Sequence, residues 1–280
     1  MKVIRGKRSL VTGAASGIGR AIALALAREG ADLCLLDIDE NGLSNVAIEA
    51  RGLGARVMTV ACDLASPTAA RNAADELLQA WGGLEILINN AGISYHGDTD
   101  TMPDEQWERV LAVDLYSPLL LTRKLLPALL SSGDAHIVNV CSILGLCAIP
   151  RFTAYQTSKY GLVGFSESLR AEYASRGLGV TALCPGFVRT NIYRAMVDST
   201  GCRPMRAPPR LLVASPEQIA ARAIRAIYRN HGVVTVTLLA GLMWRIKRWL
   251  PRLWDLANRR RSKKEPARAP TSRRDTSAAA

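Results

Sequence analysis

Two residues with complementary acid–base properties lie one helical turn apart near the middle of the chain. Tyr155 and Lys159 are four positions apart in a segment with a helical pattern, so their side chains share one face. A phenol with a pKa of about 10 is a poor base at neutral pH, and a fixed ammonium beside it favours the phenolate and lowers that pKa. Tyr155 is therefore expected to exchange a proton with an alcohol or ketone oxygen.

A glycine-rich segment near the N-terminus has the pattern of a dinucleotide site. It directly follows the apolar strand predicted over Arg8–Thr12 and opens a helical pattern. Glycines let the backbone approach a pyrophosphate, and the start of the helix offers unpaired N–H groups and the positive end of its dipole. The residues predicted to bind the cofactor here are Thr12, Gly13, Ser16, Gly17, Ile18 and Gly19.

An acidic residue at the end of the second predicted strand indicates which nucleotide binds. Asp37 lies eighteen residues after Gly19, where a carboxylate can accept both ribose hydroxyls and repels a 2′-phosphate. Neither Ser16 nor Ile38 is a Lys or Arg that would attract that phosphate. NAD is therefore the expected cofactor and NADP the alternative, and the positive charge of oxidised nicotinamide would further favour the Tyr155 phenolate.

Short apolar segments alternate with helical patterns along residues 1–240. Such alternation predicts a single α/β domain of Rossmann-like type, with a doubly wound, seven-stranded parallel sheet. Ser66-Pro67 and Ser215-Pro216 have the pattern of helix N-termini. The irregular stretch from Phe187 to Ser215 is interpreted as a lid over the site, or alternatively as a surface loop. The predicted strands are Arg8–Thr12, Asp32–Asp37, Arg56–Ala61, Ile86–Asn89, His136–Cys141, Gly179–Cys184 and Val233–Thr237.

Five motifs in order, over residues from about 5 to 237, resemble the short-chain dehydrogenase/reductase family. Besides the glycine segment they are Asp63, the segment Asn89-Asn90-Ala91-Gly92, the pair Tyr155 and Lys159 with Ser142 before it, and the segment 185–190. The resemblance implies that Asp63 binds adenine, that Lys159 also binds the nicotinamide ribose and that Ser142 binds the substrate oxygen. The further cofactor-binding residues it implies are Asn90, Ala91, Gly92, Pro185, Gly186, Val188 and Thr190, the last holding the nicotinamide amide.

One position departs from the family pattern. Asp114 stands where the family has an asparagine that supports a water relay to the lysine, and Trp107 and Pro127 fit the usual spacing on either side. A carboxylate can accept a hydrogen bond from water or Lys159, but it cannot donate as an amide does. Asp114 therefore either retunes the relay or reduces activity, and we expect a site that still works.

The expected activity is interconversion of a secondary alcohol and a ketone by hydride transfer with NAD(P). One alternative is an NADPH-dependent carbonyl or oxoacyl reductase, which Asp37 disfavours. The other is a non-catalytic nucleotide-binding scaffold of the same fold, for which Asp114 is the only support. By resemblance we expect a homo-oligomer formed through the helices that carry Asp114 and Tyr155.

The cysteines and histidines do not form a metal-binding pattern. No C-x-x-C pair occurs among the six cysteines, and three of them lie in predicted strands, so buried, reduced thiols are expected and no metal site is predicted. There is no pattern of a secretory signal and no apolar run long enough to span a membrane. We therefore expect a cytoplasmic protein, or one on the cytosolic face of a membrane.

Most of the positive charge lies in the last forty residues. Of the net charge of +12, +9 comes from Gly241–Ala280, with twelve Lys/Arg against three acidic residues. We predict an amphipathic helix over 241–258, split or kinked at Pro251, and a basic disordered tail over 259–280. This extension is interpreted as a peripheral anchor on an anionic membrane, which would favour a lipophilic substrate such as a steroid, retinoid or long-chain ketone. Packing on a partner subunit or over the substrate cleft is the alternative, and a nucleic-acid partner is not expected because no base-reading module is found.

Overall fold

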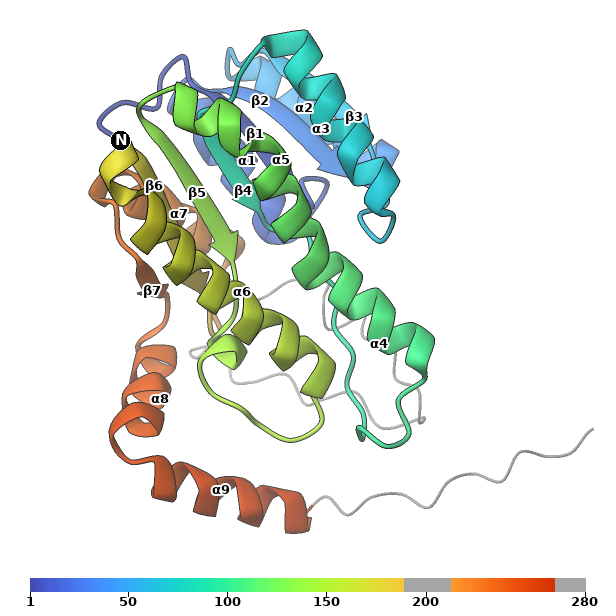
Figure 1. Ribbon diagram of the computed structural model, residues 1–280, viewed down its shortest axis with the longest axis vertical. Helices are drawn as coiled ribbons and strands as arrows, with labels where there is room; N and C mark the ends of the chain where they lie inside the picture. Colours follow the sequence, from blue (N-terminus) through green and yellow to red (C-terminus); the bar gives the residue numbers. More distant parts are fainter. Residues whose placement is uncertain (189–212, 265–280) are drawn as a thin grey trace, which may run out of the picture.

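The structure, a computed structural model, describes residues 1–188 and 213–264. Its described part contains a seven-stranded sheet in the order β3-β2-β1-β4-β5-β6-β7, and every neighbouring pair is parallel (Figure 1). The predicted doubly wound α/β fold is thereby confirmed. Most of the expected loop over 187–215, together with Thr190, Cys202 and residues 265–280, lies outside the described residues. The strands are β1 (Arg8–Thr12), β2 (Asp32–Asp37), β3 (Val57–Ala61), β4 (Ile86–Asn89), β5 (Ala135–Val140), β6 (Leu178–Cys184) and β7 (Val233–Thr235).

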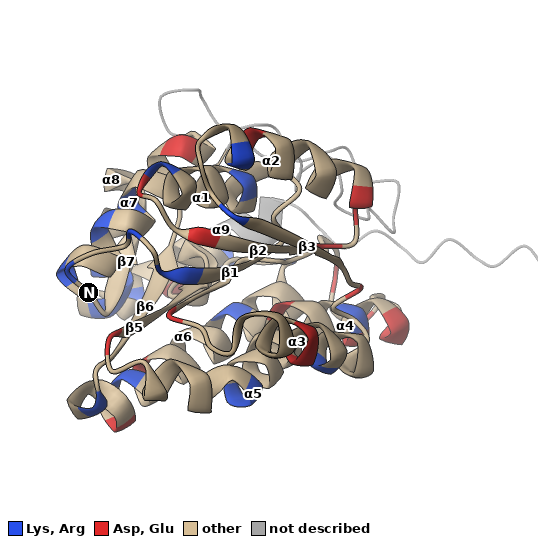
Figure 2. Cartoon of the chain, turned by 90° about the horizontal axis from the view of Figure 1, so that it is seen from above, with Lys and Arg blue, Asp and Glu red and all other residues tan. Residues whose placement is uncertain are grey.

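Helices cover both faces of the sheet, which is why the central strands are apolar on both sides. Helices α1, α2 and α7 lie on one face, and α3, α4, α5 and α6 lie on the other (Figure 2). Asp114 lies in a short π-helical turn, η1 (Ala112–Tyr116), between α4 and α5. The helices named here are α1 (Gly17–Arg28), α2 (Glu40–Gly52), α3 (Pro67–Trp81), α4 (Asp104–Leu111), α5 (Ser117–Ser131), α6 (Thr153–Tyr173) and α7 (Pro216–Arg229).

The predicted helix starts are confirmed by their hydrogen bonds. The Ser66 hydroxyl accepts from the Ala69 N–H at 3.3 Å, and Ser215 forms a reciprocal capping box with Gln218. In each case proline follows the cap, where its missing N–H leaves no hydrogen bond unmade. These caps fix where α3 and α7 begin.

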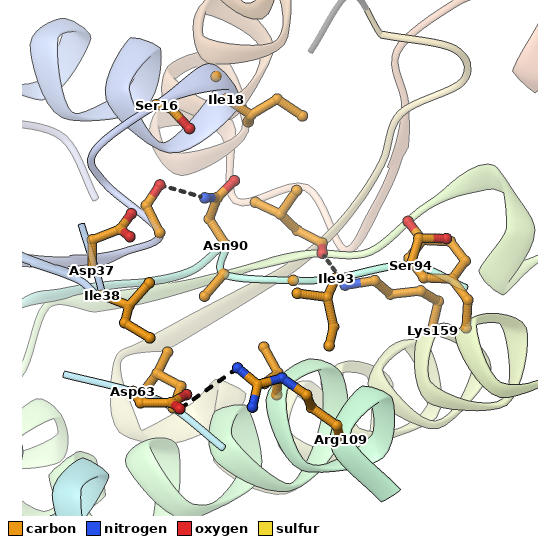
Figure 3. Close-up of a pocket in the computed structure, with 18 of the residues that line it drawn as sticks. Ser16, Ile18, Asp37, Ile38, Asp63, Asn90, Ile93, Ser94, Arg109 and Lys159 are labelled. Carbon is orange, nitrogen blue, oxygen red and sulfur yellow. Dashed lines mark hydrogen bonds and ion pairs between the residues drawn. The ribbon is translucent and has the colours of Figure 1, made fainter. Parts of the chain in front are cut away.

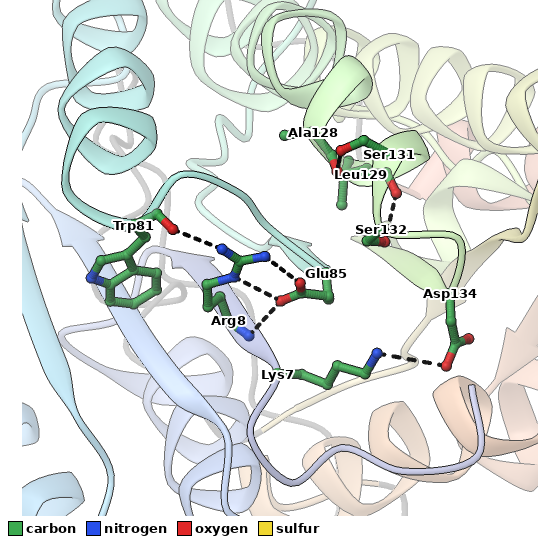
Figure 4. A network of polar contacts seen from close by, with 9 residues as sticks. All are labelled: Lys7, Arg8, Trp81, Glu85, Ala128, Leu129, Ser131, Ser132 and Asp134. Carbon is green, nitrogen blue, oxygen red and sulfur yellow. Dashed lines mark hydrogen bonds and ion pairs between the residues drawn. The ribbon is translucent and has the colours of Figure 1, made fainter.

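A polar network ties the first strand to the fourth at the edge opposite the carboxyl ends of the strands (Figure 4). The Arg8 guanidinium pairs with the Glu85 carboxylate through two nitrogens and donates to the Trp81 carbonyl at 2.7 Å. The carboxylate also accepts from the Arg8 backbone N–H at 2.8 Å. Because β1 and β4 are not consecutive in the chain, this pairing helps to set their relative position.

The C-terminal extension forms two helices, α8 (Leu238–Trp249) and α9 (Pro251–Lys264), and the predicted split at Pro251 is confirmed. The helical part is longer than the expected 241–258 at both ends. Thr237 caps α8 by accepting from the Ala240 N–H at 3.1 Å, which also ends β7 early. At the other end, residues 259–264 continue the helix because Arg and Lys have high helix propensity and suit a helix C-terminus.

The two helices pack on the protein's own body near the carboxyl ends of the strands (Figure 1). Trp244 and Trp254 contact the segment that follows Ser142, and both Trp254 Nε1 and Asn258 Nδ2 donate to the Ala148 carbonyl, at 2.9 and 3.0 Å. Trp249, by contrast, is 76% exposed. The expected apolar stripe is thus divided between a packed side and an exposed side.

Two further sequence-based expectations concern thiols and membrane spans. The five described cysteines are free and buried, as predicted: Cys34, Cys62, Cys141, Cys147 and Cys184. Within the described ranges, no helix combines the length and apolar character needed to cross a bilayer.

Candidate active site

A pocket of about 330 Å³ lies at the carboxyl ends of β1, β2, β4 and β5 (Figure 3). In parallel sheets of this order, the strand order reverses beside β1, and this crevice is where ligands bind. Eleven of the sequence-predicted residues line it: Gly13, Ser16, Gly17, Ile18, Asp37, Asp63, Asn90, Ala91, Gly92, Tyr155 and Lys159.

The glycine loop is held in place by side chains from β1 and the segment after β4. The Thr12 hydroxyl accepts from the Asn90 and Ala91 N–H groups at 2.9 and 3.0 Å. In return, Asn90 Nδ2 donates to the Thr12 and Gly13 carbonyls at 3.0 and 3.1 Å. The side chains of Thr12 and Asn90 therefore tie the glycine loop to the segment after β4, and Asn90 also lines the pocket.

Glycine is required at two positions of this loop for different reasons. Gly13 has φ +64°, a conformation that side chains disfavour, and a Cβ there would lie 2.8 Å from Ala91 Cα. Gly19 has no such torsion, but a Cβ on it would overlap the Gly13 carbonyl oxygen. These two positions explain why the turn and the start of α1 can pack so closely.

The start of α1 has the properties of a phosphate site. Ser16 is its N-cap but makes no side-chain capping bond, and no acidic residue lies in the first turn. By contrast, α2, α3, α7 and α8 are all capped by side chains. The free N–H groups and the positive helix end therefore face the pocket without a competing carboxylate, which suits a pyrophosphate.

Two carboxylates lie at the β2 and β3 side of the pocket. Asp37 is oriented by backbone N–H groups: Oδ2 accepts from Ala15 at 2.9 Å and Oδ1 from Asp39 at 3.1 Å. Asp63 forms an ion pair with Arg109 of α4 at 3.6 Å, and Figure 3 shows the two side chains directed toward each other. The free N–H groups of α1, the close-packed glycines and the fixed Asp37 carboxylate together fit a dinucleotide such as NAD(P).

The residues predicted to exchange the proton meet at the other end of the pocket. Ser142 acts on the Tyr155 hydroxyl and lowers its pKa, and the ammonium of Lys159 lies 5.5 Å from the centre of the Tyr155 ring. Lys159 Nζ also donates to the Val140 carbonyl at 3.3 Å and lies 3.0 Å from Asp114 Oδ2. The structure therefore brings together Ser142, Tyr155, Lys159 and Asp114, which come from three separate segments of the chain.

The pKa of Tyr155 is raised overall, although Lys159 lowers it as expected. Burial is the largest cause, Lys159 acts against it, and Asp114 adds to it, while the hydrogen bond from Ser142 favours the phenolate. The expectation counted the charges of Lys159 and of oxidised nicotinamide but neither burial nor Asp114. For Lys159, burial lowers the pKa, but Asp114, Tyr155 and Cys141 together outweigh it and raise the pKa, so the ammonium is retained. Burial raises the pKa of Asp114, and Lys159 and the Ile93 N–H act against that rise.

The remaining predicted residues lie around the pocket rather than on its lining. The Pro185 carbonyl accepts from the Ile143 N–H at 2.7 Å, so it holds the turn that follows Ser142. Gly186 packs against Thr237, and Val188 pairs with Ala214. Thr190 lies outside the described residues, and its contact with the nicotinamide amide stays a prediction.

Several lining residues were missed by the sequence argument. Arg109 carries the one charge among them, and its ion pair with Asp63 joins residues 46 positions apart, so no local pattern indicates it. Apolar and small side chains form the rest of the surface, and such residues cannot be told from core residues by type. The missed residues are Ile38, Cys62, Leu64, Ile93, Ser94, Arg109, Val113, Val140 and Cys141.

Comparison with known proteins gives consistent matches. The family model for short chain dehydrogenases matches residues 7–200. The chain is 35% identical over 246 residues to SadH of Mycobacterium tuberculosis, covering 86% of this chain and 89% of that protein. It is 32% identical over 253 residues to human estradiol 17-beta-dehydrogenase 11, covering 89% and 81%. A solved short chain dehydrogenase/reductase from Burkholderia phymatum in complex with NAD superposes with a TM-score of 0.80 at 26% identity, covering 97% of this chain and 100% of that one.

Proposed function

This chain belongs to the short-chain dehydrogenase/reductase family of NAD(P)-dependent oxidoreductases, and we propose that it uses NAD to interconvert a secondary alcohol and a ketone on a lipophilic substrate. One observation carries the proposal. A single pocket runs from the glycine loop and Asp37 to Tyr155 and Lys159, so a dinucleotide bound along the loop would end beside the acid–base pair.

The residues that would hold NAD are those of the glycine loop, Asp37, Asp63 and the Asn90–Gly92 segment, with Lys159 at the nicotinamide ribose. Bound there, NAD supplies the hydride acceptor for oxidation and, when reduced, the donor for reduction. In oxidation, Ser142 holds the substrate oxygen and Tyr155 takes its proton. In reduction, Tyr155 returns that proton to the oxygen of the ketone.

Asp37 supports NAD over NADP. Its two oxygens are fixed by the Ala15 and Asp39 N–H groups, so the carboxylate cannot easily turn away from a 2′-phosphate. The described lining of the pocket contains two cations, Arg109 and Lys159. Lys159 lies near Tyr155, and Arg109 is paired with Asp63. The reading as an NADPH-dependent reductase is therefore the weaker one.

The exposed side of α8 and α9 supports contact with an anionic membrane. Large apolar side chains there are about half exposed or more, and cations lie among them. The segment 238–260 carries no acidic residue other than Asp255. Apolar side chains and arginines on adjoining turns are complementary to an anionic bilayer surface. The residues of this surface are Leu242, Arg245, Arg248, Trp249, Leu250, Arg252, Leu253, Leu256, Arg259 and Arg260.

The packed side of the same helices links this surface to the substrate. Trp254 and Asn258 bind the Ala148 carbonyl, only six positions after Ser142. A substrate dissolved in the bilayer would thus leave the lipid close to the residue proposed to hold its oxygen. This juxtaposition supports a lipophilic alcohol or ketone as the substrate. The similarity to human estradiol 17-beta-dehydrogenase 11 is consistent with such a substrate. Oligomerisation through η1, α5 and α6 stays a prediction.

The first test is turnover on a panel of short and lipophilic secondary alcohols with NAD and with NADP. Tyr155→Phe removes only the hydroxyl and is expected to lower kcat at least about 100-fold, with NADH binding retained. Tyr160→Phe is the matched control, since Tyr160 is on the same helix but outside the pocket lining, and it should keep wild-type rates. NADH binding without turnover on any panel member, or full activity in Tyr155→Phe, would contradict the proposal.

A further inference from the structure

Asp114 is a buried carboxylate placed against the ammonium that the proposed chemistry uses. Its side chain is fully buried within the π-helical turn η1. Oδ1 accepts from the Ile93 N–H at 2.7 Å, and Oδ2 lies 3.0 Å from Lys159 Nζ. Such wide helical turns are frequent at functional sites because they redirect single side chains. Here the turn directs a charge into the active site.

The two charges form a pair that is neutral as a whole. Besides the Tyr155 ring, Lys159 Nζ contacts the neutral Val140 carbonyl and the Asp114 carboxylate, so Asp114 is its described counter-ion. An ammonium stabilises a nearby phenolate only to the extent that its charge is not balanced by another. Because this pair is buried, solvent screens neither charge strongly, and the carboxylate offsets much of the effect of Lys159 on Tyr155.

We propose that Asp114 is a positioning residue that neutralises Lys159 and so keeps Tyr155 protonated at neutral pH, which makes the enzyme favour carbonyl reduction there and restricts alcohol oxidation to alkaline pH. This inference rests on the proposed function, because it assumes that Tyr155 exchanges the substrate proton.

The other groups that act on Tyr155 do not reverse this effect. Among the described residues, the charged or titratable ones that influence the phenol are Lys159 on its own helix, Asp114 from η1 and Cys141 after β5, with Ser142 as hydrogen-bond partner. Burial, Asp114 and Cys141 all raise the pKa of Tyr155, and Lys159 and Ser142 oppose them. The phenol, which is the acid needed for reduction, is therefore the form that predominates.

Asp114→Asn separates the charge from the shape. The amide oxygen can still accept from the Ile93 N–H, so the loop after β4 keeps its anchor. Removing the negative charge of Asp114 lowers the pKa of Tyr155, because the positive charge of Lys159 is then no longer balanced and stabilises the phenolate more strongly. The pH profile of kcat/KM for oxidation should shift to lower pH by about one unit, and oxidation at neutral pH should rise severalfold.

The matched control is Asp134→Asn. It removes the same charge from a half-exposed carboxylate at the opposite end of β5, and it should leave the profile in place. If Asp114→Asn and wild type give the same oxidation profile while both turn over, the inference is wrong and Asp114 only anchors the loop.

A second readout does not depend on turnover. The ultraviolet absorbance of tyrosinate is followed as a function of pH in wild type and in Asp114→Asn. The same titration is run on each protein with Tyr155→Phe added. Subtracting the second curve from the first isolates the titration of Tyr155. We expect this component to titrate at lower pH in Asp114→Asn. An unchanged Tyr155 titration overturns the inference, whereas absent turnover in wild type with a shifted titration overturns only the proposed function.

Discussion

Replacing Asp37 by asparagine should abolish most of the discrimination against NADP. The Asp37 carboxylate is fixed by two backbone N–H groups and lines the pocket where the adenosine ribose is expected. Asparagine keeps the size and one acceptor oxygen but removes the charge. Since the chain places no unpaired described cation beside Asp37, the variant should bind the two cofactors with similar affinity rather than prefer NADP.

The magnitude follows from the charges. A 2′-phosphate carries about −1.5 to −2 charges at neutral pH. At about 4 Å from a carboxylate, each unit pair is worth about 1 kcal/mol in water and about 4 kcal/mol at a protein surface. Because Asp37 is partly exposed, we take a total of about 3 kcal/mol after discounting for screening, which corresponds to a preference of about 100-fold for NADH. In Asp37→Asn the preference should fall to about tenfold or less.

Fluorescence titration with NADH and NADPH measures both constants directly. Asp39→Asn is the matched control: Asp39 caps α2 by accepting from the Gly42 N–H at 3.0 Å, and asparagine is an equally good cap. The control should keep the wild-type ratio of affinities. The reasoning would be refuted by a wild-type protein that binds NADPH as tightly as NADH, or by an unchanged ratio in Asp37→Asn.

Two other predictions concern the loop and the C-terminal helices. Gly19→Ala places a methyl group against the Gly13 carbonyl. Thermal unfolding should show a free energy of unfolding lower by about 1–3 kcal/mol, and NADH should bind at least about tenfold more weakly. Gly52→Ala is the control: a Cβ there meets no atom, so neither stability nor NADH binding should change. In vesicle flotation, wild type should bind anionic vesicles better than neutral ones and release in high salt. The double variant Trp249→Ser/Leu253→Ser should lose this binding. The control Ile48→Ser, which alters a similarly exposed residue of α2, should keep it. Equal binding by wild type, the double variant and the control would exclude the proposed membrane surface.

The fold was predictable because the central strands are buried on both faces and because the starts of α3 and α7 carry a Ser-Pro signal. Six of the seven predicted strands match their observed limits to within one residue at both ends, and the Ser-Pro caps mark α3 and α7. The errors occur where a long-range or competing contact decides the boundary. β7 ends at Thr235 because Thr237 serves as the cap of α8, and a cap and a strand end have the same residue type in the sequence.

The pocket lining around the glycine loop was also largely predictable, since the glycine loop, Asp37 and Asn90 depend on local spacing next to a strand. The contacts of the segment after Ser142 were not. The contacts of Trp254 and Asn258 with Ala148 join residues more than 100 positions apart, and a tryptophan on an amphipathic helix has the same pattern whether it faces lipid or protein. Only the packing of α8 and α9 distinguishes Trp254 from the exposed Trp249.

The same limit applies to the electrostatics of Tyr155, and there it changes the chemical conclusion. The spacing of Tyr155 and Lys159 along one helix correctly indicates a phenol beside an ammonium. It omits a third charge that the fold brings from 45 residues before Lys159 to within 3.0 Å of it. A lysine–tyrosine motif therefore defines which groups exchange the proton, while the pH at which they do so depends on the counter-ion of the lysine. For this chain that counter-ion is Asp114. In our proposal, the direction favoured at neutral pH therefore depends on the tertiary structure rather than on the motif.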